Sequence, residues 1–209
     1  MIGVIDYGVG NVSSIINMLK KIGVPAILVR EISEIEKVDK LILPGVGSFD
    51  SGMRKLNISG MVEVIKNHAI VEKKPLLGIC LGMQMLGRKS EEGVESGLSL
   101  IPFDNKRFDF NGNQSLKIPH MGWDLSTTEL TNDPLVHELD QMQRYYFVHS
   151  YHAACDDVEN VLMSCNYGYC FTAAVKKDNI YGVQFHPEKS HKFGMALLDN
   201  FARRVWYVF

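Results

Sequence analysis

The 209-residue sequence has no long hydrophobic run and no marked excess of either charge. Because no segment approaches the length needed to cross a bilayer, we predict no membrane-spanning part. A formal net charge of −2 gives no electrostatic reason to expect binding to nucleic acid or to an anionic membrane. Residues 1–6 are apolar only briefly and lack a basic flank, so they predict a first strand rather than a signal peptide.

Cysteine is scarce, and its four positions suit neither cross-linking nor metal binding. No CxxC pair or metal-finger spacing occurs, and four cysteines in a chain of this length do not make a disulfide framework. We therefore expect a reducing, cytoplasmic location, with no metal and no cofactor. Cys155, Cys165 and Cys170 are expected to be packing residues or incidental surface thiols, whereas Cys80 stands in a different setting.

The first half of the chain alternates short apolar strands with amphipathic helices. We expect strands at residues 2–5, 26–29, 40–43 and 76–79, and helices at residues 12–22, 61–71 and 81–86. Strands separated by helices imply right-handed parallel crossovers and a doubly wound sheet.

After about residue 97 the pattern changes to strands joined by Asn, Gly and Asp. These strands are expected at residues 98–101, 106–110, 144–150, 160–165, 171–176 and 180–185, and a last helix at residues 193–205. The sequence therefore predicts an α/β fold: a flavodoxin-like open parallel sheet flanked by helices, with an antiparallel strand region in the C-terminal half. We expect residues 1–209 to form a single domain.

The most informative segment places Cys80 between two glycines, in the order Gly78-Ile-Cys80-Leu-Gly82. This pattern at a strand-to-helix turn is typical of a nucleophile elbow, here with cysteine in place of serine. The glycines permit a sharp turn, and the N-terminus of the following helix favours a thiolate. The Leu81 N–H then remains free to face a developing oxyanion. A buried structural cysteine is the alternative.

Other conspicuous segments also end parallel strands. Residues 6–11 follow the first strand, and residues 44–47, with the sequence Pro-Gly-Val-Gly, follow the third. Ligands of open α/β sheets bind at the carboxyl ends of the strands, so we expect these segments and Cys80 to lie at one site.

A cysteine nucleophile works best beside a base, and His186 is our first candidate. It follows an apolar strand and precedes Pro187-Glu188, so an extended segment would let Glu188 accept a hydrogen bond from the imidazole. Two alternatives stay open. His186 could be a buried core histidine with Glu188 a solvated acid, or the base could be His149 or His152.

Together these motifs resemble the class I (triad) glutamine amidotransferases. The finer motifs are similar to those of the glutaminase subunits of imidazole glycerol phosphate synthases, from the first strand to the last helix. They lie at residues 6–11, 44–49, 119–123, 145–151 and 182–190.

This resemblance implies a role for each matching residue. Cys80 would attack the carboxamide carbon of L-glutamine, His186 would relay protons and Glu188 would orient His186. An oxyanion hole would combine the N–H of Leu81 with that of Val46 or Gly47. Gln84 and Glu92 would hold the polar end of glutamine, although Glu92 could equally be a solvated acid.

The resemblance also implies a partner chain. Members of the family pass ammonia to a cyclase subunit, a (β/α)8 barrel that makes imidazole glycerol phosphate for histidine biosynthesis. A separate cyclase domain does not fit in 209 residues, so a heterodimer is expected. Positions matching the interface are Val9, Asn11, Trp123 and Lys189, with Lys189 as an ion-pair donor to the barrel.

Three departures from the family pattern leave other functions open. Asp124 replaces the usual Asn, residues 102–106 lack a glycine after the proline, and His191 replaces a small residue. None touches the expected triad. A paralogous glutaminase that supplies ammonia to a sugar amidotransferase in surface-polysaccharide biosynthesis is therefore an alternative. The others are a stand-alone cysteine hydrolase and a non-catalytic flavodoxin-like binding module.

Overall fold

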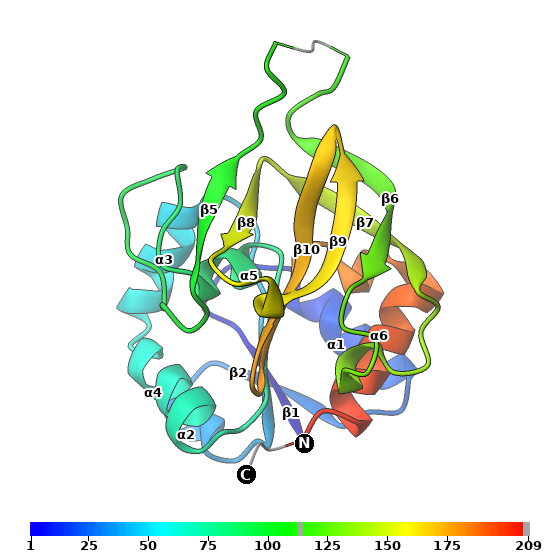
Figure 1. The fold of residues 1–209 in the computed structure, drawn as a ribbon. Helices are drawn as coiled ribbons and strands as arrows, with labels where there is room; N and C mark the ends of the chain where they lie inside the picture. Colours follow the sequence, from blue (N-terminus) through cyan, green and yellow to red (C-terminus); the bar gives the residue numbers. More distant parts are fainter. Residues whose placement is uncertain (113–114, 207–209) are drawn as a thin grey trace.

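The computed structural model describes residues 1–112 and 115–206, which form one mixed, eleven-stranded sheet with helices on both faces (Figure 1). The strands are β1 Ile2–Ile5, β2 Ala26–Val29, β3 Lys40–Leu43, β4 Leu76–Ile79, β5 Phe103–Arg107, β6 His120–Thr128, β7 Met142–His149, β8 Tyr151–Cys155, β9 Val161–Tyr167, β10 Tyr169–Lys177 and β11 Ile180–Val183. The helices are α1 Val12–Lys21, α2 Ile32–Ile35, α3 Phe49–Ile58, α4 Val62–Lys66, α5 Leu81–Leu86 and α6 His191–Arg203.

The sheet has a parallel part and an antiparallel part. Its order is β2-β1-β3-β4-β11-β10-β9-β6-β7, and β5 and β8 extend from β10 as a side branch. Strands β2, β1, β3, β4 and β11 run parallel, while β10, β9, β6 and β7 alternate in direction. This arrangement confirms the predicted α/β class.

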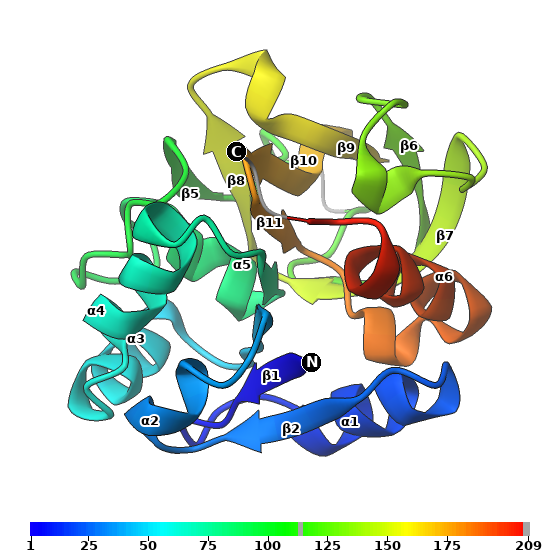
Figure 2. The same ribbon diagram turned by 90° about the horizontal axis from the view of Figure 1, so that it is seen from below.

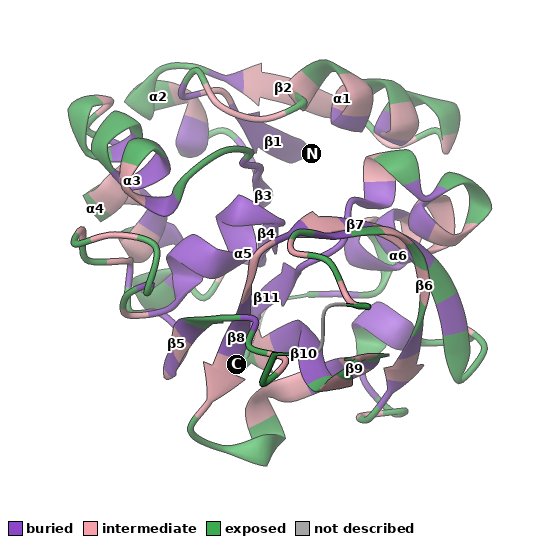
Figure 3. Cartoon of the chain, turned by 90° about the horizontal axis from the view of Figure 1, so that it is seen from above, coloured by how far each residue is buried: buried purple, intermediate pink, exposed green. Residues whose placement is uncertain are grey.

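Two apolar cores lie on opposite faces of the parallel strands. Alternation along β1 sends Ile2 and Val4 to the face covered by α1 and α6, and Ile5 to the face covered by α3, α4 and α5 (Figure 2). Figure 3 shows α5 to be buried along its length, and all of its residues, Leu81–Leu86, are buried. The helix that follows Cys80 is thus fixed in the interior.

Several sequence-based expectations need correction. Residues 98–101 are not a strand; the N–H groups of Leu98 and Leu100 donate to carbonyls of Met85 and Leu86, and the apolar run packs against α5. The strand at 180–185 is shorter, β11, and pairs in parallel with β4 as well as antiparallel with β10. The helix at 61–71 divides into α4 and a π-helical turn, Asn67–Val71. Within the described residues no helix combines the length and the apolar character that crossing a membrane requires.

Candidate active site

Cys80 stands between β4 and α5 in a backbone conformation that L-residues rarely adopt, with φ 55° and ψ −110°. The flanking glycines make this turn possible. A Cβ on Gly82 would lie 1.8 Å from the carbonyl oxygen of Leu43, and one on Gly78 would lie 2.6 Å from the carbonyl oxygen of Gly82. The strand ends and α5 therefore approach more closely than any side chain would permit, which is the geometry of a nucleophile elbow.

The Cys80 thiol is scarcely accessible to solvent. Cys80 is only 7% exposed, because the loops around the elbow enclose it, but it lines a cavity of about 410 Å³. Eight of the twelve site residues expected from the sequence line this cavity. They are Val46, Gly47, Cys80, Leu81, Gln84, Glu92, His186 and Lys189.

His186 reaches the cavity because β11 lies directly beside β4, with Val183 opposite Ile79. Both strands end at the same edge of the sheet, so the residues that follow them meet. Nδ1 of His186 lies 2.8 Å from Oε1 of Glu188, and both side chains are almost inaccessible. The segment is not extended: a 3₁₀ turn at Pro187–Lys189 brings Glu188 back to the ring.

The charge state of His186 is set by its neighbours. Burial by itself would lower its pKa, but the Cys80 sulfur and the Glu188 carboxylate raise the pKa to about 10. The second ring nitrogen, Nε2, has no hydrogen-bond partner among the described residues, although His186 lines the cavity. The ring can therefore hold a proton against Glu188 while its other nitrogen stays available for proton transfer.

The two rival histidines are occupied elsewhere. His149 Nδ1 lies 2.8 Å from the Tyr151 carbonyl oxygen, and its Nε2 lies 3.0 Å from Nδ1 of His120. Burial lowers the pKa of His149 to about 3. His152 contacts the Tyr169 hydroxyl at 2.9 Å, and burial lowers its pKa as well. Although His149 lines the cavity, the geometry favours His186 as the base.

Gln84 is held by a residue that the sequence analysis did not single out. Its Nε2 donates to the Tyr151 carbonyl oxygen at 3.1 Å and to Oε1 of Gln184 at 3.0 Å. Gln184 is fully buried, and its own Nε2 lies 3.8 Å from the Cys80 sulfur. Gln184 thus links Gln84 to the thiol. Its position two residues before His186 is the signal that could have identified it.

Glu92 lines the cavity but is not simply a solvated acid. Its Oε2 accepts a hydrogen bond of 2.7 Å from the N–H of Phe49, the first residue of α3. Lys189 also lines the cavity, and its Nζ lies 5.6 Å from the centre of the Tyr146 ring. An acidic and a basic side chain therefore flank the space in front of Cys80.

The other expected interface residues lie outside the cavity. Val9 and Asn11 belong to the loop between β1 and α1, and Trp123 is an exposed residue of β6. The Trp123 ring stacks on His191 with centroids 5.5 Å apart and packs edge-on against Tyr146. Lys189 contacts the Tyr146 ring and also lines the cavity, so it connects this aromatic group to the cavity.

The arrangement suits acyl transfer through a thioester. It provides a sulfur nucleophile at a helix N-terminus, a histidine paired with a carboxylate, and backbone N–H groups of two strand-end segments. In the described part of the chain, no cluster of three His, Cys, Asp or Glu side chains could hold a metal ion.

Comparison with known proteins agrees with this chemistry. Residues 3–205 match the family model of the class-I glutamine amidotransferases. The chain is 50% identical over 205 residues to "imidazole glycerol phosphate synthase subunit HisH 2" of Pseudomonas aeruginosa, covering 98% of this chain and 100% of that protein. It is 52% identical, with the same coverage, to the protein of that name from Methanococcus maripaludis. The fold is similar to a chain of PurLQS from Thermotoga maritima, with a TM-score of 0.74, 19% identity and 96% of each chain covered.

Proposed function

The chain belongs to the class I glutamine amidotransferases, and on that premise we propose that it is the glutaminase subunit of an imidazole glycerol phosphate synthase. One observation carries the proposal: Cys80 and His186 follow two hydrogen-bonded parallel strands and meet in one cavity, and Glu188 pairs with His186 behind it. The subunit is a single domain that works in the cytoplasm as part of a histidine biosynthetic complex.

The reaction begins when the Cys80 thiolate attacks the carboxamide carbon of glutamine. A C–S bond forms, and the carbonyl electrons move to oxygen, where N–H groups of Leu81 and of Val46 or Gly47 stabilise them. Collapse of this intermediate breaks the C–N bond. His186, whose pKa is raised to about 10 beside Cys80 and Glu188 so that it enters the reaction protonated, gives its proton to the departing amide nitrogen, which leaves as ammonia.

Hydrolysis of the thioester completes the cycle. His186 accepts a proton from water as the water oxygen attacks the thioester carbon, and the C–S bond breaks to release glutamate and regenerate the thiolate. Glu188 keeps the ring oriented through both steps and stabilises its positive charge. Neither step requires a cofactor.

Gln84 and Glu92 account for recognition of glutamine. The carboxylate of Glu92 suits the α-ammonium group of the substrate. Among the described residues nothing bonds its second oxygen, Oε1, while Oε2 is held by Phe49. Gln84, fixed by Gln184 and the Tyr151 carbonyl, presents its amide to the polar end of the substrate.

Ammonia then passes to a cyclase subunit, a (β/α)8 barrel that docks over the cavity mouth. The docking surface comprises Val9, Asn11, Trp123 and Lys189, and the stacked rings of Trp123 and His191 give it a broad apolar patch. Lys189 reaches both the cavity and Tyr146, so it is placed to report docking to the active site.

A second acceptor needs a test, because one departure from the family pattern, His191, stacks on Trp123 at this surface. Asp124, the residue after Trp123 in β6, lies instead 3.4 Å from Nε2 of the buried His120. A partner other than the cyclase, such as a sugar amidotransferase synthase, is the alternative. Native mass spectrometry of the purified complex identifies the partner, and a synthase in place of a cyclase would replace our proposal with this one.

The glutaminase itself is tested with Cys80→Ala, using Cys170→Ala as the matched control because Cys170 is exposed and does not line the cavity. In the assembled complex, Cys80→Ala should abolish glutamate release but leave synthesis from added ammonia intact. Cys170→Ala should behave as the wild type. Glutamate release that survives in Cys80→Ala would disprove the mechanism.

Dependence on the partner separates this subunit from a free-standing hydrolase. Gly47 has φ 96°, and glycine can exchange positive for negative φ at little cost. The peptide that carries an oxyanion donor can therefore reorient. One missing donor costs about 3 kcal/mol, or about a hundredfold in rate. We expect weak glutamate release from the chain alone and strong stimulation by the partner with its acceptor ligand. Lys189→Ala should weaken this stimulation, and full activity without a partner would favour the hydrolase.

A further inference from the structure

Two segments that carry expected site residues are joined by hydrogen bonds at the first turn of α3. One is the strand-end loop, residues 44–48, which contains Val46 and Gly47 and leads directly into α3. The other is the Glu92 loop, residues 88–97, which follows α5. They are distant in sequence, yet both line the cavity in front of Cys80.

The connection is a reciprocal pair of carboxylate-to-backbone contacts. Glu92, from the second loop, accepts the N–H of Phe49 at 2.7 Å. Asp50, the next residue of α3, reaches the opposite way: its Oδ1 accepts the N–H groups of Val94 and Glu95, each at 3.0 Å. Both acids therefore satisfy backbone donors on the partner segment, with the strength that an ionised acceptor gives.

The fit around Asp50 leaves little freedom. Gly93 passes so close that a Cβ there would lie 2.0 Å from the Asp50 oxygen. The backbone N–H groups of Glu95 and Val94 lower the pKa of Asp50, so it stays ionised at neutral pH. Arg54, one turn along α3, lies 3.9 Å from Asp50 and 3.7 Å from Glu95, too far to replace those hydrogen bonds.

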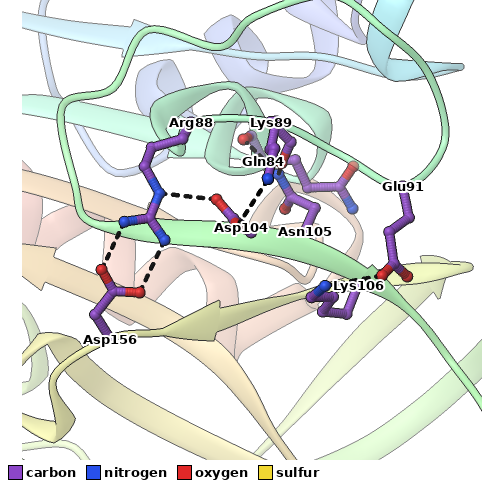
Figure 4. A network of polar contacts seen from close by, with 8 residues as sticks. All are labelled: Gln84, Arg88, Lys89, Glu91, Asp104, Asn105, Lys106 and Asp156. Carbon is purple, nitrogen blue, oxygen red and sulfur yellow. Dashed lines mark hydrogen bonds and ion pairs between the residues drawn. The ribbon is translucent and has the colours of Figure 1, made fainter.

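The other end of the Glu92 loop is fixed independently, as Figure 4 shows. The buried Asn105 donates from Nδ2 to the carbonyl oxygens of Gln84 and Lys89. Arg88 binds Asp156 through two nitrogens and Asp104 through a third. The loop is thus anchored before residue 92 by β5 and β8, and after it by Asp50.

We propose that Asp50 is a positioning residue for glutamine recognition, an inference that rests on the proposed function. By holding residues 94 and 95 against α3, Asp50 fixes the carboxylate of Glu92 at the Phe49 N–H and keeps its other oxygen directed to the substrate ammonium. Because Phe49 directly continues the strand-end loop, occupation of the glutamine site and the conformation of Val46–Gly47 are linked through Glu92.

The experiment compares Asp50→Ala with Asp50→Asn in the assembled complex. The alanine loses all contacts to the Glu92 loop, whereas the amide oxygen of asparagine can still accept both N–H groups that Oδ1 accepts. We expect the KM for glutamine to rise about tenfold in Asp50→Ala, with a smaller change in kcat, and to return close to the wild-type value in Asp50→Asn. Arg54→Ala, which keeps the carboxylate-to-backbone contacts, is the matched control and should leave KM unchanged.

A second readout excludes general damage to the site. Alkylation of Cys80 by iodoacetamide, followed at the peptide by mass spectrometry, does not use Glu92 and should proceed at the wild-type rate in Asp50→Ala. An unchanged KM in Asp50→Ala, equal impairment in the two Asp50 variants, or equally slowed alkylation would overturn the inference. If the wild type itself fails to hydrolyse glutamine, the proposed function fails and this inference fails with it.

Discussion

Two buried histidines, His149 and His186, line the same cavity, and their pKa values move in opposite directions. His120, His149 and His152 pack around Phe108 among aromatic rings, and burial lowers the pKa of each of them. His186 is also buried, yet Cys80 and Glu188 raise its pKa to about 10. Burial alone makes a histidine neutral, and a specific charged partner is needed to keep one protonated at neutral pH. Of these two environments, that of His186 is the one suited to acid–base chemistry.

The largest effect is expected from His186→Ala. Because triad members act as a unit, it should reduce glutamate release by about 10⁵-fold, nearly as much as loss of Cys80. The measurement is kcat for glutamine in the assembled complex, with ammonia-dependent synthesis as the control. Activity close to that of the wild type would transfer the role of base to His149 and reverse the comparison.

Glu188→Gln should have a large but smaller effect. The amide keeps the shape of the side chain but removes the negative charge that stabilises the imidazolium, so the loss should be about a hundredfold less severe than for His186→Ala. The pH profile of kcat provides the check. The structure indicates that Glu188 raises the pKa of His186. In Glu188→Gln the limb of the pH profile that reports His186 should therefore move to lower pH, and an unmoved profile would contradict this assignment.

His149→Phe should change catalysis least, although it removes a histidine from the cavity wall. The substitution leaves the buried ring of His120 and the Tyr151 carbonyl without their partner, so we expect a loss of about 1–3 kcal/mol in unfolding free energy. Glutamate release should fall by less than about tenfold. Chemical denaturation and steady-state kinetics on one preparation separate the two effects, and a loss as great as that of His186→Ala would refute the distinction.

The subtlest effect is the pH dependence of stability. His186 has a raised pKa in the fold, so its contribution to stability is complete below pH about 6.5 and is lost as the pH rises through about 10. His149 has a lowered pKa, so its contribution is complete above pH about 6.5 and is lost as the pH falls towards 3. The difference in unfolding free energy between the wild type and His186→Ala should therefore decrease as the pH rises on the alkaline side. The same difference for His149→Phe should decrease as the pH falls on the acid side. If both differences decreased over the same pH range, the two histidine environments would not differ.

The sequence carried enough information for the parallel half of the fold and for the core of the candidate site. The segment around Cys80 encodes its turn locally, because Gly78 and Gly82 are required by close backbone approaches. His186 and Glu188 were also within reach, since both follow directly on an apolar strand. That they meet Cys80 depends on β11 lying beside β4, which only the long-range pairing establishes.

The missed features depend on contacts between distant segments. Strand β6 was overlooked because a glycine, Gly122, interrupts a segment rich in polar residues, and its pairing with β7 and β9 overrides weak local preference. Helix α3 was also missed, since it contains a glycine, Gly52, which is a weak helix former. Gly52 is needed there because a Cβ would lie 2.8 Å from the Leu81 side chain. The buried run near residue 98 was wrongly predicted as a strand, because a short apolar run does not by itself distinguish a strand from an irregular core segment.

The position of β11 between β4 and β10 has a consequence for the growing polypeptide on the ribosome. Strand β4, which precedes Cys80, is synthesised long before its neighbour Ile180–Val183, so one edge of β4 has no partner until almost the whole chain has emerged. An unpaired apolar edge is a place where a nascent chain can associate wrongly. The same delay withholds His186 from the cysteine throughout synthesis, so an incomplete or C-terminally truncated product carries the thiol without its base.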